Sequence, residues 1–218
     1  MDFDWKSIDT VLLDMDGTLL DLHYDSHFWL DYLPSVWSRE NKLGLAESKA
    51  KFGPIFEQHA GTLNWYCVDF WSKELGLDIM RYKKELSHKI AYRPTAQAFL
   101  SKCGQQSSDV RLVTNAHRKV LELKNEMTGI NRYFHQTICS HELNMPKEDP
   151  KFWQALNAKQ AFDPLRTLFI DDNESVLESA SSYGIKHLYS IAEPDSQRPR
   201  RLKSKFPMLD RLHSPILS

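Results

Sequence analysis

The stretch Thr10-Val11-Leu12-Leu13-Asp14-Met15-Asp16-Gly17-Thr18 decides the fold. A short apolar run of strand length ends at a carboxylate, a second carboxylate follows two residues later, and Gly17 allows a sharp turn. Comparable runs recur at 110–114, 136–140, 166–171 and 186–191, and most lead into helical patterns such as 117–127, 148–160 and 174–183. Buried strands that alternate with helices predict an α/β fold with a largely parallel sheet.

This alternation is interrupted between residues 22 and 92, where the patterns are helical throughout. We expect helices at 26–39, 46–59, 62–75 and 79–90, with breaks at Gly44, Gly53-Pro54, Gly61 and Gly76. An insert directly after the first strand would lie above the carboxyl edge of the sheet, where ligands of parallel sheets collect. The sequence therefore predicts a core of residues 1–21 and 93–218 and a helical cap of residues 22–92.

Composition narrows the class of protein and its partners. The 218 residues carry 28 Lys and Arg against 29 Asp and Glu, so the net charge of -1 gives no reason to expect nucleic acid or a membrane surface as partner. Cys67, Cys103 and Cys139 lie far apart without a CxxC pair, which favours free thiols in a reducing compartment over disulfides or a zinc site. No stretch is long and apolar enough to span a bilayer, so a cytoplasmic location is expected, while the oligomeric state stays open.

A basic run stands near the C-terminus, with Arg198, Arg200, Arg201, Lys203 and Lys205. We expect a solvated terminal helix, or a tail docked by Phe206, Leu209 and Leu212, rather than a nucleic-acid site.

Polar side chains follow the expected strands at their carboxyl ends, where Asp14, Thr114 and Asp171 should meet. A carboxylate that attacks a phosphate monoester approaches an anion, and this repulsion costs about 4 kcal/mol at an effective dielectric of about 20. Mg2+, which prefers hard oxygen ligands, and a lysine such as Lys147 would offset that cost. The hydroxyl of Thr114 and the amides near Asn115, just before a helix, suit a phosphate oxygen.

The order Asp14-x-Asp16-Gly17-Thr18, Thr114, Lys147 and Asp171-Asp172 resembles the four motifs of the haloacid dehalogenase (HAD) superfamily. The resemblance implies a Rossmann-like core with a type-1 cap, Asp14 as the nucleophile, and Asp16 as general acid and then base. It implies that Thr114 and Lys147 hold the phosphoryl group. Mg2+ would bind Asp14, the Asp16 carbonyl and Asp172, with Asp171 as its support or an alternative ligand. Because dehalogenases lack an acid at the place of Asp16, phosphatase chemistry is expected.

Several stretches carry a narrower resemblance, to the bacterial GMP/IMP nucleotidases. They are the first-strand run, Thr62-Leu63-Asn64-Trp65-Tyr66-Cys67 in the cap with its continuation to Trp71, Pro146-Lys147-Glu148-Asp149, and Thr167-Leu168-Phe169-Ile170-Asp171-Asp172. It implies purine nucleoside monophosphates, GMP and IMP, as substrates. On a continuous helix from Thr62, Trp65 would face away from the apolar arc. We therefore expect Trp65, with Asn64 or Tyr66, to line the pocket and stack on the purine. Packing of Trp65 on another cap helix or on a partner subunit is an equal alternative.

Two other functions stay open from the sequence. The first is a phosphatase or mutase of sugar phosphates or other small phosphometabolites. The second, from another class, is a non-catalytic nucleotide-sensing protein with the same fold.

Overall fold

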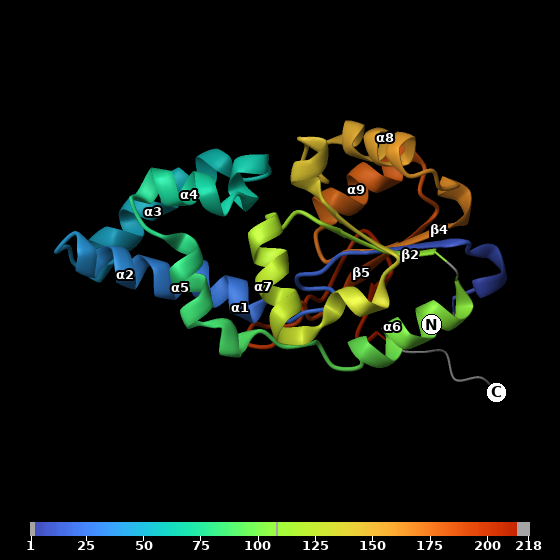
Figure 1. The fold of residues 1–218 in the computed structure, drawn as a ribbon, viewed down its shortest axis with the longest axis horizontal. Helices are drawn as coiled ribbons and strands as arrows, with labels where there is room; N and C mark the ends of the chain where they lie inside the picture. Colours follow the sequence, from blue (N-terminus) through green and yellow to red (C-terminus); the bar gives the residue numbers. More distant parts are fainter. Residues whose placement is uncertain (1–2, 108, 213–218) are drawn as a thin grey trace.

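The core is a six-stranded parallel sheet in the computed structural model, which describes residues 3–107 and 109–212 (Figure 1). The strands lie in the order β3-β2-β1-β4-β5-β6. Their bounds are β1 Thr10–Leu13, β2 Asp109–Thr114, β3 Gln136–Cys139, β4 Thr167–Ile170, β5 His187–Ile191 and β6 Met208–Leu209. The prediction of an α/β fold with a parallel sheet is confirmed. The pattern did not indicate the short β6, which pairs with β5 through Ser190 and Ile191.

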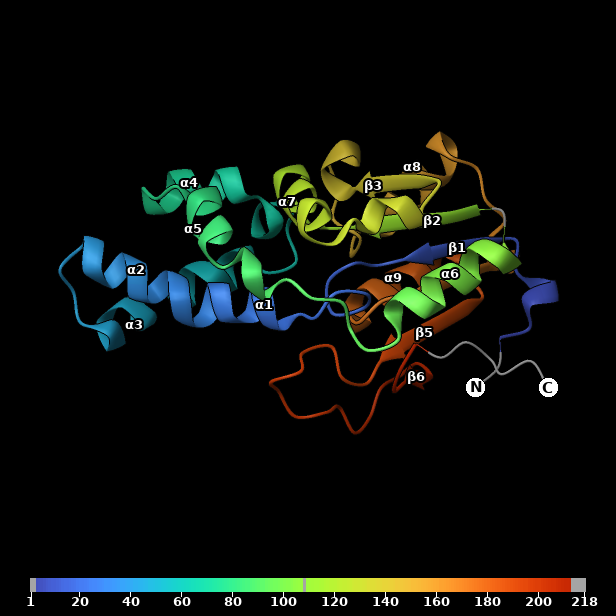
Figure 2. The same ribbon diagram turned by 60° about the horizontal axis from the view of Figure 1, so that its bottom comes forward.

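Helices cover both faces of this sheet because alternate residues of its strands point to opposite sides. Val11 and Leu13 of β1 pack in one cluster with α6, and Leu12 packs in a second cluster with α8 and α9. The helices of the core are α6 Ala96–Gln106, α7 Arg118–Thr128, α8 Pro150–Lys159 and α9 Glu174–Tyr183. Figure 2 shows α8 and α9 on the side of the sheet opposite to α6. Short helical turns complete the core: η1 Trp5–Ser7, η5 Ile130–Tyr133, η6 Ser140–Leu143 and η7 Pro164–Arg166.

The segment after β1 forms a helical cap beside the core (Figures 1 and 2). Its elements are α1 His23–His27, the π-helical η2 Phe28–Tyr32, α2 Leu33–Glu40, α3 Leu45–His59, η3 Leu63–Tyr66, α4 Val68–Leu75, α5 Ile79–Glu85 and η4 Ser87–Lys89. Aromatic side chains fill its interior, and Val120 of α7 packs into the same cluster. The cap therefore rests on the core through α7, while the exact division at residues 22 and 92 stays a prediction.

Two expectations about the cap helices were wrong. Helix α3 runs through Gly53-Pro54, where a break was expected. Pro54 removes one amide from the helix, but Phe52 is buried in the cap cluster, and this packing keeps the helix intact. The helix expected over 62–75 is split at Cys67, which has extended backbone angles.

None of the helices in the described ranges is long and apolar enough to cross a membrane. The prediction of free thiols is confirmed for Cys67, Cys103 and Cys139.

Candidate active site

The site lies at the carboxyl end of β1, where the strand order reverses. β1 pairs with β2 on one side and β4 on the other, so residues that follow these three strands meet in one crevice. Asp14 follows β1 and donates its amide to the carbonyl of Ile170 at 3.0 Å. Thr114 ends β2, and Asp171 follows β4. All three line one cavity, as the strand ends predicted.

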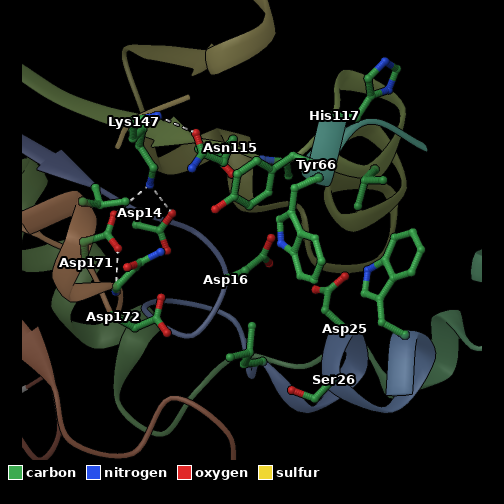
Figure 3. Close-up of a pocket in the computed structure, with 18 of the residues that line it drawn as sticks. Asp14, Asp16, Asp25, Ser26, Tyr66, Asn115, His117, Lys147, Asp171 and Asp172 are labelled. Atoms are coloured by element: carbon green, nitrogen blue, oxygen red, sulfur yellow. Dashed lines mark hydrogen bonds and ion pairs between the residues drawn. The ribbon is translucent and has the colours of Figure 1, made fainter. Parts of the chain in front are cut away.

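Lys147 is the positive centre of this crevice (Figure 3). Its Nζ donates to Asp14 Oδ1 at 2.6 Å, to Asp171 Oδ2 at 2.7 Å and to the carbonyl of Val113 at 3.0 Å. Burial opposes the charge of Lys147, but the two carboxylates outweigh burial and raise its pKa. The ammonium is therefore held charged beside Asp14.

The carboxylates around Lys147 fit a hard divalent cation. Asp14, Asp171 and Asp172 each offer an oxygen, and these oxygens lie within 4.8 Å of one another. Asp14 Oδ2 is buried and lacks a hydrogen-bond partner among the described residues. Two buried carboxylates and the half-buried Asp172 against one lysine leave negative charge that a cation would neutralise.

Asp171 and Asp172 differ in what their oxygens contact. Asp171 accepts from Lys147 through Oδ2 and from the amide of Asn173 through Oδ1 at 2.8 Å, so both of its oxygens are engaged. The Asp172 carboxylate has a weaker partner, Arg201, at 3.5 Å. Burial and, after it, the charge of Asp14 raise the pKa of Asp172 to about 7. The contacts favour Asp172 as the direct ligand of a cation and Asp171 as its support.

Gly17 makes the turn that brings these segments together. Its φ is +83°, and a Cβ at this position would lie 2.7 Å from Asp172 Cγ and 3.0 Å from Pro194 Cβ. The close approach of the two acidic loops therefore requires glycine here.

Asp16 belongs to a buried chain of charges that the sequence did not reveal. Its Oδ1 accepts from Lys124 Nζ at 2.6 Å, and the same ammonium donates to Asp25 Oδ2 at 2.5 Å. Lys83 donates to the other oxygen of Asp25 at 2.8 Å. Burial, opposed by Lys124, raises the pKa of Asp16 to about 6. Nothing in the sequence pattern of α7 singled out Lys124.

A second chain of hydrogen bonds connects the cap to Lys147. Tyr66 donates its hydroxyl to Glu148 Oε1 at 2.5 Å, and Asn115 Nδ2 donates to Glu148 Oε2 at 2.9 Å. Asn115 Oδ1 accepts from the amide of Lys147 at 2.9 Å. Asn173 adds a longer bond to Glu148 at 3.3 Å. Both polar atoms of the Asn115 side chain thus have partners within the protein, and the bond to the Lys147 amide positions Lys147. Asn115 also lines the cavity, so its contact with substrate stays a prediction.

The crevice opens into a cavity of about 660 Å³ that extends under the cap. Aromatic side chains of the cap line its other part: Trp29, Phe56, Trp65 and Trp71, while Tyr66 lies between them and Lys147. The ring of Trp65 lies with its centroid 5.7 Å from that of Phe56 and 6.3 Å from that of Trp71. Trp65 thus both lines the cavity and packs in the cap.

The expected reason for the placement of Trp65 was wrong, because the chain is not one helix from Thr62 onward. Trp65 lies in η3, and the extended Cys67 turns it relative to α4. Asn64 is exposed and does not line the cavity, so its expected contact with substrate is not supported.

The basic segment near the C-terminus also differs from expectation. No helix forms over residues 198–205, which are all described, whereas Leu209 and Leu212 are buried as expected for a docked tail. Arg201 donates to the Asp172 carbonyl, and Arg201 and Lys203 line the cavity. The sequence did not distinguish Arg201 and Lys203 from the exposed basic residues around them.

Comparison with known proteins extends these observations. Residues 8–184 match the family model described as haloacid dehalogenase-like hydrolase. The chain is 36% identical over 206 residues to the GMP/IMP nucleotidase YrfG of Escherichia coli (strain K12), covering 94% of this chain and 93% of that protein.

Among solved structures, a HAD phosphatase from Thermococcus onnurineus superposes with a TM-score of 0.78 at 21% identity and 94% coverage of both chains. The HAD-hydrolase YfnB of Bacillus subtilis, bound to magnesium, superposes with a TM-score of 0.66 at 18% identity, covering 94% of this chain and 95% of that one. Both likenesses confirm the fold.

Proposed function

Because the chain belongs to the haloacid dehalogenase-like hydrolases, we propose that it is a Mg2+-dependent phosphomonoesterase that hydrolyses purine nucleoside 5'-monophosphates such as GMP and IMP. The observation that carries the proposal is a single cavity with a lysine and carboxylate cluster at one end and indole rings at the other. The first end suits a phosphate with its cation, and the second suits a flat aromatic base. The 36% identity to a GMP/IMP nucleotidase supports the same substrate class.

The phosphate end assigns a role to each side chain. Asp14 attacks phosphorus, an oxygen of Asp14 becomes bonded to it, and the ester bond to the nucleoside oxygen breaks. Asp16 gives its proton to that leaving oxygen. Asp16 then takes a proton from water as the water oxygen attacks phosphorus, which releases phosphate and regenerates Asp14.

The remaining groups bind and orient the phosphoryl group. Lys147 supplies a fixed positive charge, and Thr114 offers its hydroxyl at the end of β2. Asp14, the Asp16 carbonyl and Asp172 would hold Mg2+, which when bound supplies the positive charge that the transferring phosphoryl group needs. Tyr66 lies at the cap side of this site and helps exclude water when the cap is closed (Figure 3).

Phosphate release with Mg2+ across a panel of nucleoside monophosphates and sugar phosphates tests the proposal. We expect GMP and IMP to give the highest kcat/KM, because the aromatic end of the cavity binds a purine. A sugar phosphate as the best substrate would contradict the nucleotidase. Binding of nucleotides without turnover would identify a sensor instead.

The substitution Trp65→Ala tests the role of the indole ring. Stacking of a base on an aromatic ring contributes about 1–3 kcal/mol, so we expect KM for GMP to rise by about fivefold or more. KM for p-nitrophenyl phosphate, which has no purine, should change much less. Trp37→Ala is the matched control, since Trp37 packs on Phe52 in the cap but does not line the cavity. If both variants show the same KM for GMP, the stacking role of Trp65 is wrong.

A further inference from the structure

Three side chains of types that can bind transition metals meet at the boundary between cap and core, apart from the carboxylate cluster. Cys67 comes from the turn between η3 and α4 of the cap, His117 precedes α7, and His141 lies in η6 of the core. The Cys67 sulfur and one nitrogen of each ring all lie within 4.8 Å of one another. No spacing in the sequence indicates this group, because its members are 50 and 24 residues apart and only the fold brings them together.

The buried ring nitrogens of the half-buried His141 find none of their usual hydrogen-bond partners in the described part of the chain. Both of its ring nitrogens are buried and make no hydrogen bond with the described residues. Its nearest ring is His117, in an edge-to-face contact with centroids 4.9 Å apart. Because most buried polar atoms are hydrogen-bonded, a ring with two nitrogens unpaired among the described residues is suited to bind a ligand. Burial lowers the pKa of His141 to about 4, so the ring is neutral near pH 7, the form that binds metals.

The donors of this group suit zinc. One thiolate and two imidazoles are a ligand set of Zn2+, and a fourth position can hold solvent. Tetrahedral bonds of about 2.0–2.3 Å to the cation place the ligand atoms about 3.4 Å apart. The three ligand atoms lie within 4.8 Å of one another, so small side-chain movements would bring them to this distance. Asp69 is a further neighbour, with Oδ2 at 3.8 Å from His117 Nε2.

Backbone amides already contact two of these ligands. Phe70 donates its amide to Cys67 Sγ at 3.4 Å, a contact that would support a thiolate. If His117 binds the cation through Nε2, its Nδ1 carries the ring proton and no longer accepts from the Lys119 amide. The hydrogen bond lost in this way is long, at 3.4 Å. The site thus requires little rearrangement.

We propose that Cys67, His117 and His141 bind a divalent cation of the zinc class, which ties the cap to the core. On binding, the Cys67 thiol releases its proton to solvent and its sulfur bonds to the cation. Cys67 directly follows Tyr66, whose hydroxyl contacts Glu148 of the core, so the cation would secure the same closed contact. Occupation of the site therefore holds the cap closed and slows exchange of substrate and product.

A Co2+ titration of the full chain with Mg2+ present tests the binding site directly. Co2+ replaces Zn2+ in such sites, and a thiolate-to-cobalt charge-transfer band appears only when sulfur is a ligand, whatever happens at the carboxylate cluster. We expect this band to saturate at one equivalent in the wild type, to disappear in Cys67→Ser, and to need about tenfold more Co2+ in His141→Gln. Cys103→Ala, which removes another thiol from the core, should keep the band. A wild type without the band, or a band that persists in Cys67→Ser, would overturn the site.

The effect on the cap is tested by thermal unfolding and by turnover, both with Mg2+ present. Zn2+ at about a hundredfold excess over its Kd should raise the wild-type Tm by about 5 °C and leave the Tm of Cys67→Ser much less changed. Zn2+ should also slow phosphate release more in the wild type than in Cys67→Ser, since any Zn2+ that displaces Mg2+ slows both equally. Equal slowing in the two proteins would overturn the closing role. Because the cobalt band and the Tm do not depend on catalysis, failure here is distinct from failure of the proposed phosphatase.

Discussion

Asp14→Asn is expected to lower phosphate release from GMP by about 10⁴-fold or more, because an amide cannot replace the carboxylate that attacks phosphorus. The fold should survive the change. Asn keeps the oxygen that accepts from Lys147, and one negative charge leaves the group of Asp14, Asp171 and Asp172. Without added metal, the Tm of the variant should therefore equal or exceed that of the wild type.

Mass spectrometry of acid-quenched enzyme separates this role from general damage to the site. The wild type mixed with substrate should carry a phosphoryl group on Asp14, and Asp14→Asn should carry none. Asp9→Asn, which alters an exposed carboxylate paired with Arg166, is the control and should keep full activity. Turnover of Asp14→Asn within tenfold of the wild type would contradict the assignment.

Asp16→Asn is expected to lower kcat for GMP by about 10²- to 10⁴-fold, the usual contribution of a general acid and base. Asn keeps an oxygen for the Lys124 ammonium, so the buried chain through Asp25 is preserved. The loss should depend on the leaving group. The alkoxide of a nucleoside needs the proton of Asp16, whereas p-nitrophenolate leaves without one.

Rapid-mixing measurements with either substrate in excess over the enzyme isolate the step that Asp16 serves. With p-nitrophenyl phosphate, the variant should release one equivalent of p-nitrophenol in a burst and then stall, because the second step still lacks its base. With GMP, the first step itself should be slow. If the first step slows equally for both substrates, Asp16 does not act by giving a proton to the leaving group.

The sequence predicted the fold and the phosphate end of the site because both rest on short local patterns. An apolar run that ends at Asp14 is at once a buried strand and a carboxylate at the edge of the sheet. The same holds for Thr114 and for Asp171. Parallel pairing then brings the strand ends together without further information.

The sequence could not predict the contacts that depend on the packing of distant segments. Lys124 looks like an ordinary lysine of an amphipathic helix that also carries Lys119, and only the position of α1 against α7 brings Asp25 to it. The placement of Trp65 depends on one extended residue, Cys67, within an otherwise helical pattern. Cys67 and His141 have no metal-binding spacing, so their approach follows from how the cap lies on the core.

The contact between Tyr66 and Glu148 has a consequence for the rate of the catalytic cycle. Glu148 directly follows Lys147 and shares Asn115 with it, so the cap is fastened to the same segment that holds the phosphoryl charge. Opening the cap to release inorganic phosphate must break this half-buried contact. The hydrogen bond of the Tyr66 hydroxyl therefore slows product release in each turnover. Tyr66→Phe should release phosphate faster and exclude water from the site less well.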